Sequence, residues 1–361
     1  MRRTHTPPRR PTLLGLALLT GCGQHRICPG AGGDRAAFHE MWSLLDRRYA
    51  VFAERLDGQS WEDVGQDACP ALDGRTSKNA LYDVMLDTLQ VLDDGHTVLH
   101  APKLGRHRDA WVSAYPHYPA LYSLEGRVED ILLDEDLRWA ARDWVAWGRI
   151  GGVGYLSLTS FDGLSRGGGQ RSDVAAIRSA MDQVLDDLGH LDGMVVDVRA
   201  NEGGWDTAAL EVARRFEGPR SLAFAKQTRN GPDHSDLGPW KEAWVDASED
   251  DAYTGEVVVL TSGGTFSAAE IFVLAMGGRD HVTVLGEPTS GHLSDIHTKR
   301  LDSGWAVDFS GERYRDVHGD VHEARGVPVD QHVELDVDAL ADGRDVQLLA
   351  ALDRHLPTTP P

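Results

Sequence analysis

Short, largely apolar runs that alternate with helical segments constrain the fold of this chain more than any other feature. Residues 150–158, 194–198, 257–260 and 282–285 have the composition of strands. Strands that alternate with helices predict parallel pairing, and apolar strands without polar alternation predict burial on both faces of a sheet. The segments between and after them that have helical spacing are 174–188, 207–216, 267–275 and 346–356.

The domain organisation follows from this change of pattern near Gly148. Before it, residues 34–49 and 81–92 have helical spacing, and the second segment follows Ser77 as a possible N-cap. We therefore predict an α+β protein with a mixed, largely parallel sheet in a β/α core. The expected parts are an N-terminal helical subdomain over 34–100, a connecting segment over 101–147 and the core over 148–356.

The first 21 residues have the layout of a secretory signal. Four arginines precede a leucine-rich apolar run, which ends in Leu-Thr-Gly before Cys22. This ending resembles a bacterial lipobox, in which the cysteine becomes the lipidated first residue. We expect an exported protein that is anchored to a bacterial membrane through Cys22 and a tether over 22–33; the alternative is a plain signal peptide with an incidental cysteine.

Charge and cysteine content restrict the partners and the compartment. The formal net charge of −21 argues against nucleic-acid binding, which requires a basic surface. Export would leave Cys28 and Cys69, which an oxidising compartment could pair. The sequence leaves open whether they form a disulfide or remain two thiols, since it does not give their separation.

A strand followed by a serine at a helix start carries the strongest chemical signal. The strand at 257–260 leads through a glycine-containing turn to Ser267, which opens a helix beginning Ala268-Ala269-Glu270. This arrangement exposes a hydroxyl near the positive end of a helix dipole, beside free backbone N–H groups. The structural alternative is that Ser267 is only an N-cap.

Three further segments combine a turn with polar residues. The strand at 194–198 ends in Asp197-Val-Arg-Ala-Asn-Glu-Gly203-Gly204, whose paired glycines allow close approach to a ligand. This segment lacks the lysine and the adjacent serine or threonine of a phosphate-binding loop. His96 follows a helix stop, and Glu323 precedes the turn Gly326-Val-Pro-Val-Asp330.

Together these four segments resemble the C-terminal-processing (tail-specific) peptidase family, in the order typical of that family. The resemblance extends from about residue 34 to the C-terminus and implies that Ser267 is the nucleophile. It further implies an oxyanion hole from the N–H groups of Gly203 or Gly204 and of Ala268.

The branch of the family follows from the position that would hold a catalytic lysine, which is His292 here. The absence of that lysine resembles the tricorn-like branch, which implies His96 as the base and Glu323 as the supporting carboxylate. His292 remains the rival base. Gly95 stands where tricorn-type enzymes have a serine, and the interval after His96 is too short for an inserted PDZ domain.

The predicted function is that of an exported serine peptidase that cleaves peptides or proteins through an acyl-enzyme. No cofactor is expected. No metal site is expected either, because His297, His318 and His322 lack ligand spacing and read as surface residues. The alternative is a catalytically inactive ligand- or peptide-binding protein on the same scaffold, since this family also includes a retinoid-binding protein. The oligomeric state is not predicted.

Overall fold

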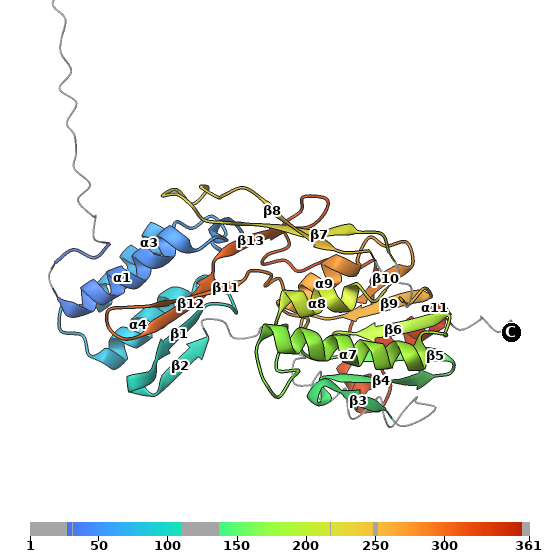
Figure 1. Ribbon diagram of the computed structural model, residues 1–361. Coiled ribbons are helices and arrows are strands. Elements are labelled where there is room, and N and C mark those ends of the chain that lie inside the picture. The colour runs from blue at the N-terminus through green and yellow to red at the C-terminus, as the bar shows by residue number, and fades with distance from the viewer. Residues whose placement is uncertain (1–26, 31, 110–136, 217, 248–251, 356–361) are drawn as a thin grey trace, which may run out of the picture.

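The computed structural model describes residues 27–30, 32–109, 137–216, 218–247 and 252–355. Figure 1 shows two parts side by side, an N-terminal subdomain of helices with a small sheet and a larger β/α core. A long β-ribbon spans both parts. The α+β class predicted from the sequence is confirmed.

A seven-stranded sheet forms the centre of the core. Its order is β14-β10-β9-β6-β5-β4-β3, in which the first five strands pair in parallel and β4 pairs antiparallel with both β5 and β3. The mixed, largely parallel sheet is therefore confirmed. The strands are β3 (Arg138–Ala140), β4 (Val145–Ile150), β5 (Val153–Leu158), β6 (Gly193–Asp197), β9 (Glu256–Thr261), β10 (Val282–Gly286) and β14 (Gln331–His332).

Helices bury both faces of this sheet. Met194 and Val196 of β6 pack toward the face covered by α7, α8 and α9, whereas Val195 packs with α11 on the opposite face. Consecutive residues of a strand point to opposite faces, so a strand buried on both sides must be apolar throughout. The helices are α7 (Gln170–Leu188), α8 (Asp206–Ala213), α9 (Ala268–Met276) and α11 (Val346–His355).

The N-terminal subdomain includes a segment from late in the chain. Strands β1 and β2 form an antiparallel sheet with β11 and β12, in the order β11-β12-β1-β2. Trp305 and Phe309 pack in the same core as the N-terminal helices. The subdomain predicted over 34–100 is thus completed by residues 296–310. Its elements are α1 (Gly33–Arg48), α2 (Phe52–Arg55), α3 (Trp61–Ala68), α4 (Lys78–Gln90), β1 (Val98–Ala101), β2 (Arg106–Asp109), β11 (Ile296–Arg300) and β12 (Ala306–Ser310).

A third, antiparallel sheet has the order β13-β7-β8 and lies along one side of both parts (Figure 1). The sequence analysis did not identify β7 and β8. The strand predicted over 150–158 corresponds to β5, but it begins at Val153, because a turn at Gly151-Gly152 separates it from β4, which was not predicted and pairs with it as a hairpin. The remaining elements are β7 (Ser221–Thr228), β8 (Lys241–Val245), β13 (Glu312–Arg315), α10 (Val337–Ala341), η1 (Cys69–Ala71), η2 (Pro102–Leu104) and η3 (Ala141–Asp143).

The proposed signal segment, Cys22 and half of the tether lie outside the described residues. Residues 110–136, in the predicted connecting segment, also lie outside them. Within the described ranges, no helix is both long and apolar enough to cross a membrane.

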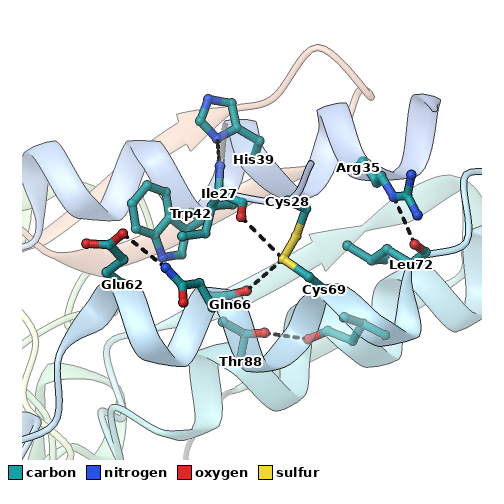
Figure 2. Close-up of a disulfide and its surroundings, with 12 residues drawn as sticks. Ile27, Cys28, Arg35, His39, Trp42, Glu62, Gln66, Cys69, Leu72 and Thr88 are labelled. Carbon is teal, nitrogen blue, oxygen red and sulfur yellow. Dashed lines mark hydrogen bonds between the residues drawn. A yellow bond between two sulfur atoms is a disulfide. The ribbon is translucent and has the colours of Figure 1, made fainter. Parts of the chain in front are cut away.

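The structure pairs Cys28 with Cys69 in a disulfide. Figure 2 shows the bond joining the segment before α1 to the end of α3, beside Trp42. Trp42 and Trp61 tie the same two helices, because each indole N–H donates to the backbone carbonyl of the other residue, at 2.9 and 3.1 Å. The disulfide therefore closes a helical unit that is already well packed.

Replacing both cysteines, as Cys28→Ser/Cys69→Ser, should lower the free energy of unfolding by up to about 4 kcal/mol. The reason is that the bond closes a loop between residues 41 positions apart, which restricts the unfolded chain. Denaturant titration with and without reductant measures the effect. Reductant should lower the free energy of unfolding of the natural protein and leave that of the variant unchanged. Equal free energies of unfolding for the natural protein and the variant in the absence of reductant would contradict the prediction.

Candidate active site

Ser267 lies at the start of α9, after the turn that leaves β9. Its backbone has φ 58° and ψ −125°, a conformation uncommon for residues other than glycine. The turn is held against the neighbouring β6 segment, since Ser262 Oγ donates to Arg199 O at 2.8 Å and Thr265 Oγ1 donates to Val198 O at 3.0 Å. The serine is therefore presented in a fixed, strained conformation, as is frequent at functional sites.

Glu270 lies beneath Ser267 and is fully buried. Its carboxylate accepts hydrogen bonds from the N–H of Ser267 at 3.1 Å and of His292 at 2.8 Å. It also accepts from Gly291 N–H and Thr289 Oγ1. Burial raises the pKa of Glu270 to about 7, and these donors oppose that rise. The sequence analysis gave Glu270 no role, although the spacing of a capping box, Ser followed three residues later by Glu, was a signal for it.

His96 follows α4 in a turn ordered by Asp94. The carboxylate of Asp94 accepts hydrogen bonds from His96 N–H at 2.9 Å, from Tyr49 OH at 2.8 Å and from Thr97 Oγ1. The turn places His96 Nε2 at 3.1 Å from Ser267 Oγ. These residues are 171 positions apart, and the structure brings them within hydrogen-bonding distance.

The surroundings of His96 favour its neutral form. Burial lowers the pKa of the imidazole, Asp94 raises it, and the Arg55 guanidinium lowers it, with a net decrease. Burial raises the pKa of Asp94, but Arg55 and His96 outweigh this effect and hold it below its usual value. A neutral imidazole beside an ionised carboxylate can accept a proton from the serine hydroxyl.

His292, the rival base, is also close. Its ring stacks on Phe266 with centroids 4.8 Å apart, and its centroid lies 6.2 Å from that of His96. Its Nδ1 lies 2.9 Å from Ser290 Oγ. Burial lowers the pKa of His292 to about 3, with a further decrease from Arg55. The geometry favours His96, because its ring nitrogen is the one that reaches Ser267 Oγ.

Glu323 is buried in the layer behind His96. One carboxylate oxygen lies 2.5 Å from Arg55 Nη2, and the other accepts from Leu293 N–H at 3.0 Å. Burial raises the pKa of Glu323 to about 7, although Arg55 lowers it. No hydrogen bond between described residues joins Glu323 to His96, and His96 Nδ1 is buried without a partner among them. The sequence analysis placed Glu323 near the site but did not identify Arg55.

The glycine turn at Gly203-Gly204 lies close against Ser267. Gly203 has φ 95°, and a Cβ added there would lie 2.6 Å from Ser267 Cβ and 2.8 Å from Ala268 N. The N–H of Gly203 donates to Asn201 Oδ1 at 2.8 Å. Asp197 and Arg199 form a buried ion pair beneath this turn, as expected of a structural role.

Among the described residues, no group of three or more histidine, cysteine, aspartate or glutamate side chains has the arrangement of a metal site. The groups near Ser267 are the imidazole of His96, the backbone of the glycine turn and the buried carboxylate of Glu270. This set provides a nucleophile, a base and hydrogen-bond donors, which is what acyl transfer requires.

Known proteins share both sequence and fold with this chain. The carboxyl-terminal-processing protease of Synechocystis sp. is 29% identical over 205 residues, which cover 56% of this chain and 43% of that protein. The chain spans less than half of the length of the curated relatives it matches.

Solved structures extend the likeness to most of the chain. An inferred peptidase from Parabacteroides merdae ATCC 43184 superposes with a TM-score of 0.76 at 25% identity, covering 90% of this chain and 96% of that one. The tricorn protease shares the fold alone, with a TM-score of 0.52 at 14% identity over 88% of this chain and 36% of that one. The family model for peptidase family S41 matches residues 152–333, about half of the chain, and the chain therefore belongs to peptidase family S41.

Proposed function

We propose that this protein is a serine peptidase that cleaves peptides or proteins through an acyl-enzyme, with Ser267 as nucleophile and His96 as general base. The observation that carries the proposal is the 3.1 Å approach of His96 Nε2 to Ser267 Oγ. An N-cap role for Ser267 does not explain why an imidazole contacts its hydroxyl. A structural role for His96 does not explain why its partner is a serine in a strained backbone conformation.

The chemistry proceeds in two halves. His96 Nε2 accepts the hydroxyl proton as Ser267 Oγ attacks the peptide carbonyl carbon, which gives a tetrahedral intermediate. The imidazolium then donates this proton to the leaving amine, and the C–N bond breaks to leave an acyl ester on Ser267. Water, deprotonated by His96, attacks the ester, and the proton returns to Oγ as the acid product leaves.

The negative charge of the tetrahedral oxygen requires hydrogen-bond donors. We assign Ala268 N–H, at the positive end of α9, and the N–H of the glycine turn. Gly204 is the favoured donor of that turn, because Gly203 N–H already donates to Asn201 Oδ1. Gly203 then serves by letting its backbone approach Ser267 and Ala268.

Glu323 completes the proposed Ser-His-Glu site from behind. Its carboxylate has no direct contact with His96 among the described residues, so it supports the base indirectly. We expect its loss to cost less activity than the loss of Ser267 or His96.

We further propose that the protein is exported and held at a bacterial membrane by a lipid on Cys22. The Cys28–Cys69 disulfide supports an oxidising compartment, since disulfides persist mainly outside the cytosol. The substrate would then be a peptide or protein of the cell envelope.

A binding protein without catalysis is the second candidate. The observation in its favour is His96 Nδ1, which is buried and has no partner among the described residues. Most catalytic histidines are oriented by a bond from this nitrogen. A binding protein would have the same arrangement of residues without an activated serine.

Covalent labelling with a fluorophosphonate, followed by intact mass, separates the two functions. The natural protein should gain one adduct, and Ser267→Ala should gain none. His96→Ala should slow labelling by at least about 10²-fold, because the hydroxyl would lose its general base. His292→Ala should retain most of the rate.

Ser60→Ala provides the matched serine control, since Ser60 caps α3 by accepting a hydrogen bond from Asp63 N–H. It should label like the natural protein. Lack of labelling in a well-folded natural protein, or an adduct that persists in Ser267→Ala, would refute the peptidase assignment.

Gly203→Ala should abolish labelling, because its Cβ would collide with Ser267 and Ala268. Gly152→Ala is the control for backbone strain. Its φ is 88°, but open space surrounds the added Cβ. Each substitution should lower the free energy of unfolding by roughly 1–2 kcal/mol through its positive φ, and only the first should stop labelling. Unchanged labelling in Gly203→Ala would show that this glycine does not shape the site.

A further inference from the structure

Arg55, the last residue of α2, reaches from the N-terminal subdomain to three groups around the site. Its Nη1 donates to Asp93 O at 2.5 Å, in the turn that carries His96. Its Nη2 donates to Gly291 O at 2.6 Å and to Glu323 Oε1 at 2.5 Å. The Arg55 side chain is 3% exposed and that of Glu323 is 0% exposed. One guanidinium thus joins the base turn, the loop beside His292 and the buried carboxylate.

We propose that Arg55 is a positioning residue that couples Glu323 to the turn bearing His96, so that the base meets Ser267 in the correct place. The inference rests on the serine-peptidase function proposed above. Gly95, the residue before His96, has no side chain that could reach Glu323. Arg55 supplies a connection between carboxylate and base turn that bypasses residue 95.

The charge balance supports a fixed role for this contact. Glu323 is buried and receives one cation, so removal of Arg55 would leave a carboxylate without compensation. Arg55 also bonds a backbone carbonyl on each side of the site. A planar guanidinium can hold several acceptors in one fixed geometry, which a flexible ammonium does not reproduce.

Arg55 also acts on the proton affinity of His96. The charged and titratable groups around this imidazole are Asp94 on its own turn, Arg55 from α2, and His292 and Asp295 from the loop before β11, with Glu323 behind Arg55. The guanidinium lowers the pKa of His96, so its removal should raise it. The base must be neutral to act, so the labelling rate falls at low pH as His96 becomes protonated. This fall, the acid limb of the pH–rate profile, should move to higher pH when Arg55 is removed.

A double-mutant cycle on the fluorophosphonate labelling rate tests the coupling. Arg55→Met and Glu323→Gln should each slow the reaction by about 10-fold to 10²-fold. The labelling rate of the double variant should lie within about threefold of the Arg55→Met rate, because Glu323→Gln removes the carboxylate that would otherwise be left without its cation. If the double variant is slowed by about the product of the two single-variant factors, the two residues act independently and the proposed coupling is overturned.

The pH profile provides a readout that a merely structural role would not move. The natural protein should show an acid limb below the usual histidine value near 6.5, because burial lowers the pKa of His96. Arg55→Met should shift this limb upward, and Arg55→Lys, which keeps the charge, should restore its position while labelling more slowly than the natural protein. An unshifted limb in a folded Arg55→Met protein would overturn the inference.

Arg229 is the matched control for subdomain docking. It follows β7, is 5% exposed, and donates to the carbonyls of Tyr49 and Asp46 in the N-terminal subdomain, at 3.1 and 3.0 Å. Arg229→Met should weaken docking without touching the site, and should leave the acid limb in place. An equal shift in Arg229→Met would assign the effect to docking and overturn the inference.

Two further results keep the test decisive. If Arg55→Met fails to fold, two other tests take its place: the pH profile of Arg55→Lys, and the recovery of labelling in Arg55→Ala when guanidinium is added. If Arg55→Lys does not keep the natural acid limb and guanidinium does not restore labelling, the inference is overturned. If the natural protein itself does not label, the peptidase function and this inference fall together. If the natural protein labels and the Arg55 variants label at the same rate and with the same pH profile, this inference is overturned and the peptidase function stands.

Discussion

The hydrogen bond between His96 Nε2 and Ser267 Oγ is the contact on which the proposed function depends, and each partner comes from a different part of the molecule. Ser267 is placed by the end of β9 and the start of α9 in the core. His96 is placed by the turn after α4 in the N-terminal subdomain. Residues 296–310 return to that subdomain and pack in its core, so the chain crosses the boundary more than once. Hydrogen bonding between the two side chains thus requires both cores to be intact and docked.

Several buried charged side chains surround this contact, some bonded to the Ser267 or His96 backbone and others farther from it. Glu270 accepts hydrogen bonds from the backbone N–H groups of Ser267 and His292, while Asp94 accepts one from the backbone N–H of His96. Arg55 is the cation that faces both Asp94 and Glu323. Charges buried in this way are costly unless each is paired or hydrogen-bonded, and most of these groups are held by several donors. These groups therefore fix the backbone around Ser267, while burial and Arg55 together lower the pKa of the His96 imidazole.

The sequence predicted the core well because its signal is local. Apolar strands such as 257–260, and a serine at the next helix start, predict the sheet strands and the position of Ser267 at the start of a helix from a few neighbouring residues. The sequence also singled out His96, Glu323 and the glycine turn through their likeness to a family. It did not find Arg55 or the role of Glu270, because their partners lie far away in the chain or are backbone atoms. Strand β4 of the hairpin β4–β5 was missed because Gly148 and Arg149 interrupt its apolar run, and the predicted strand was begun at Ile150 although β5 begins at Val153. Strands β7 and β8 follow no simple alternation and were missed for that reason.

A crystal structure of the protein after reaction with a fluorophosphonate tests the central claim most directly. The phosphonyl group stands in for the tetrahedral intermediate of acyl transfer. The account predicts an adduct on Ser267 Oγ, with one phosphonyl oxygen within about 3 Å of Ala268 N–H and of the glycine turn, and with His96 Nε2 still facing Oγ. An adduct whose oxygen points away from these N–H groups, or a histidine other than His96 at Oγ, would contradict it.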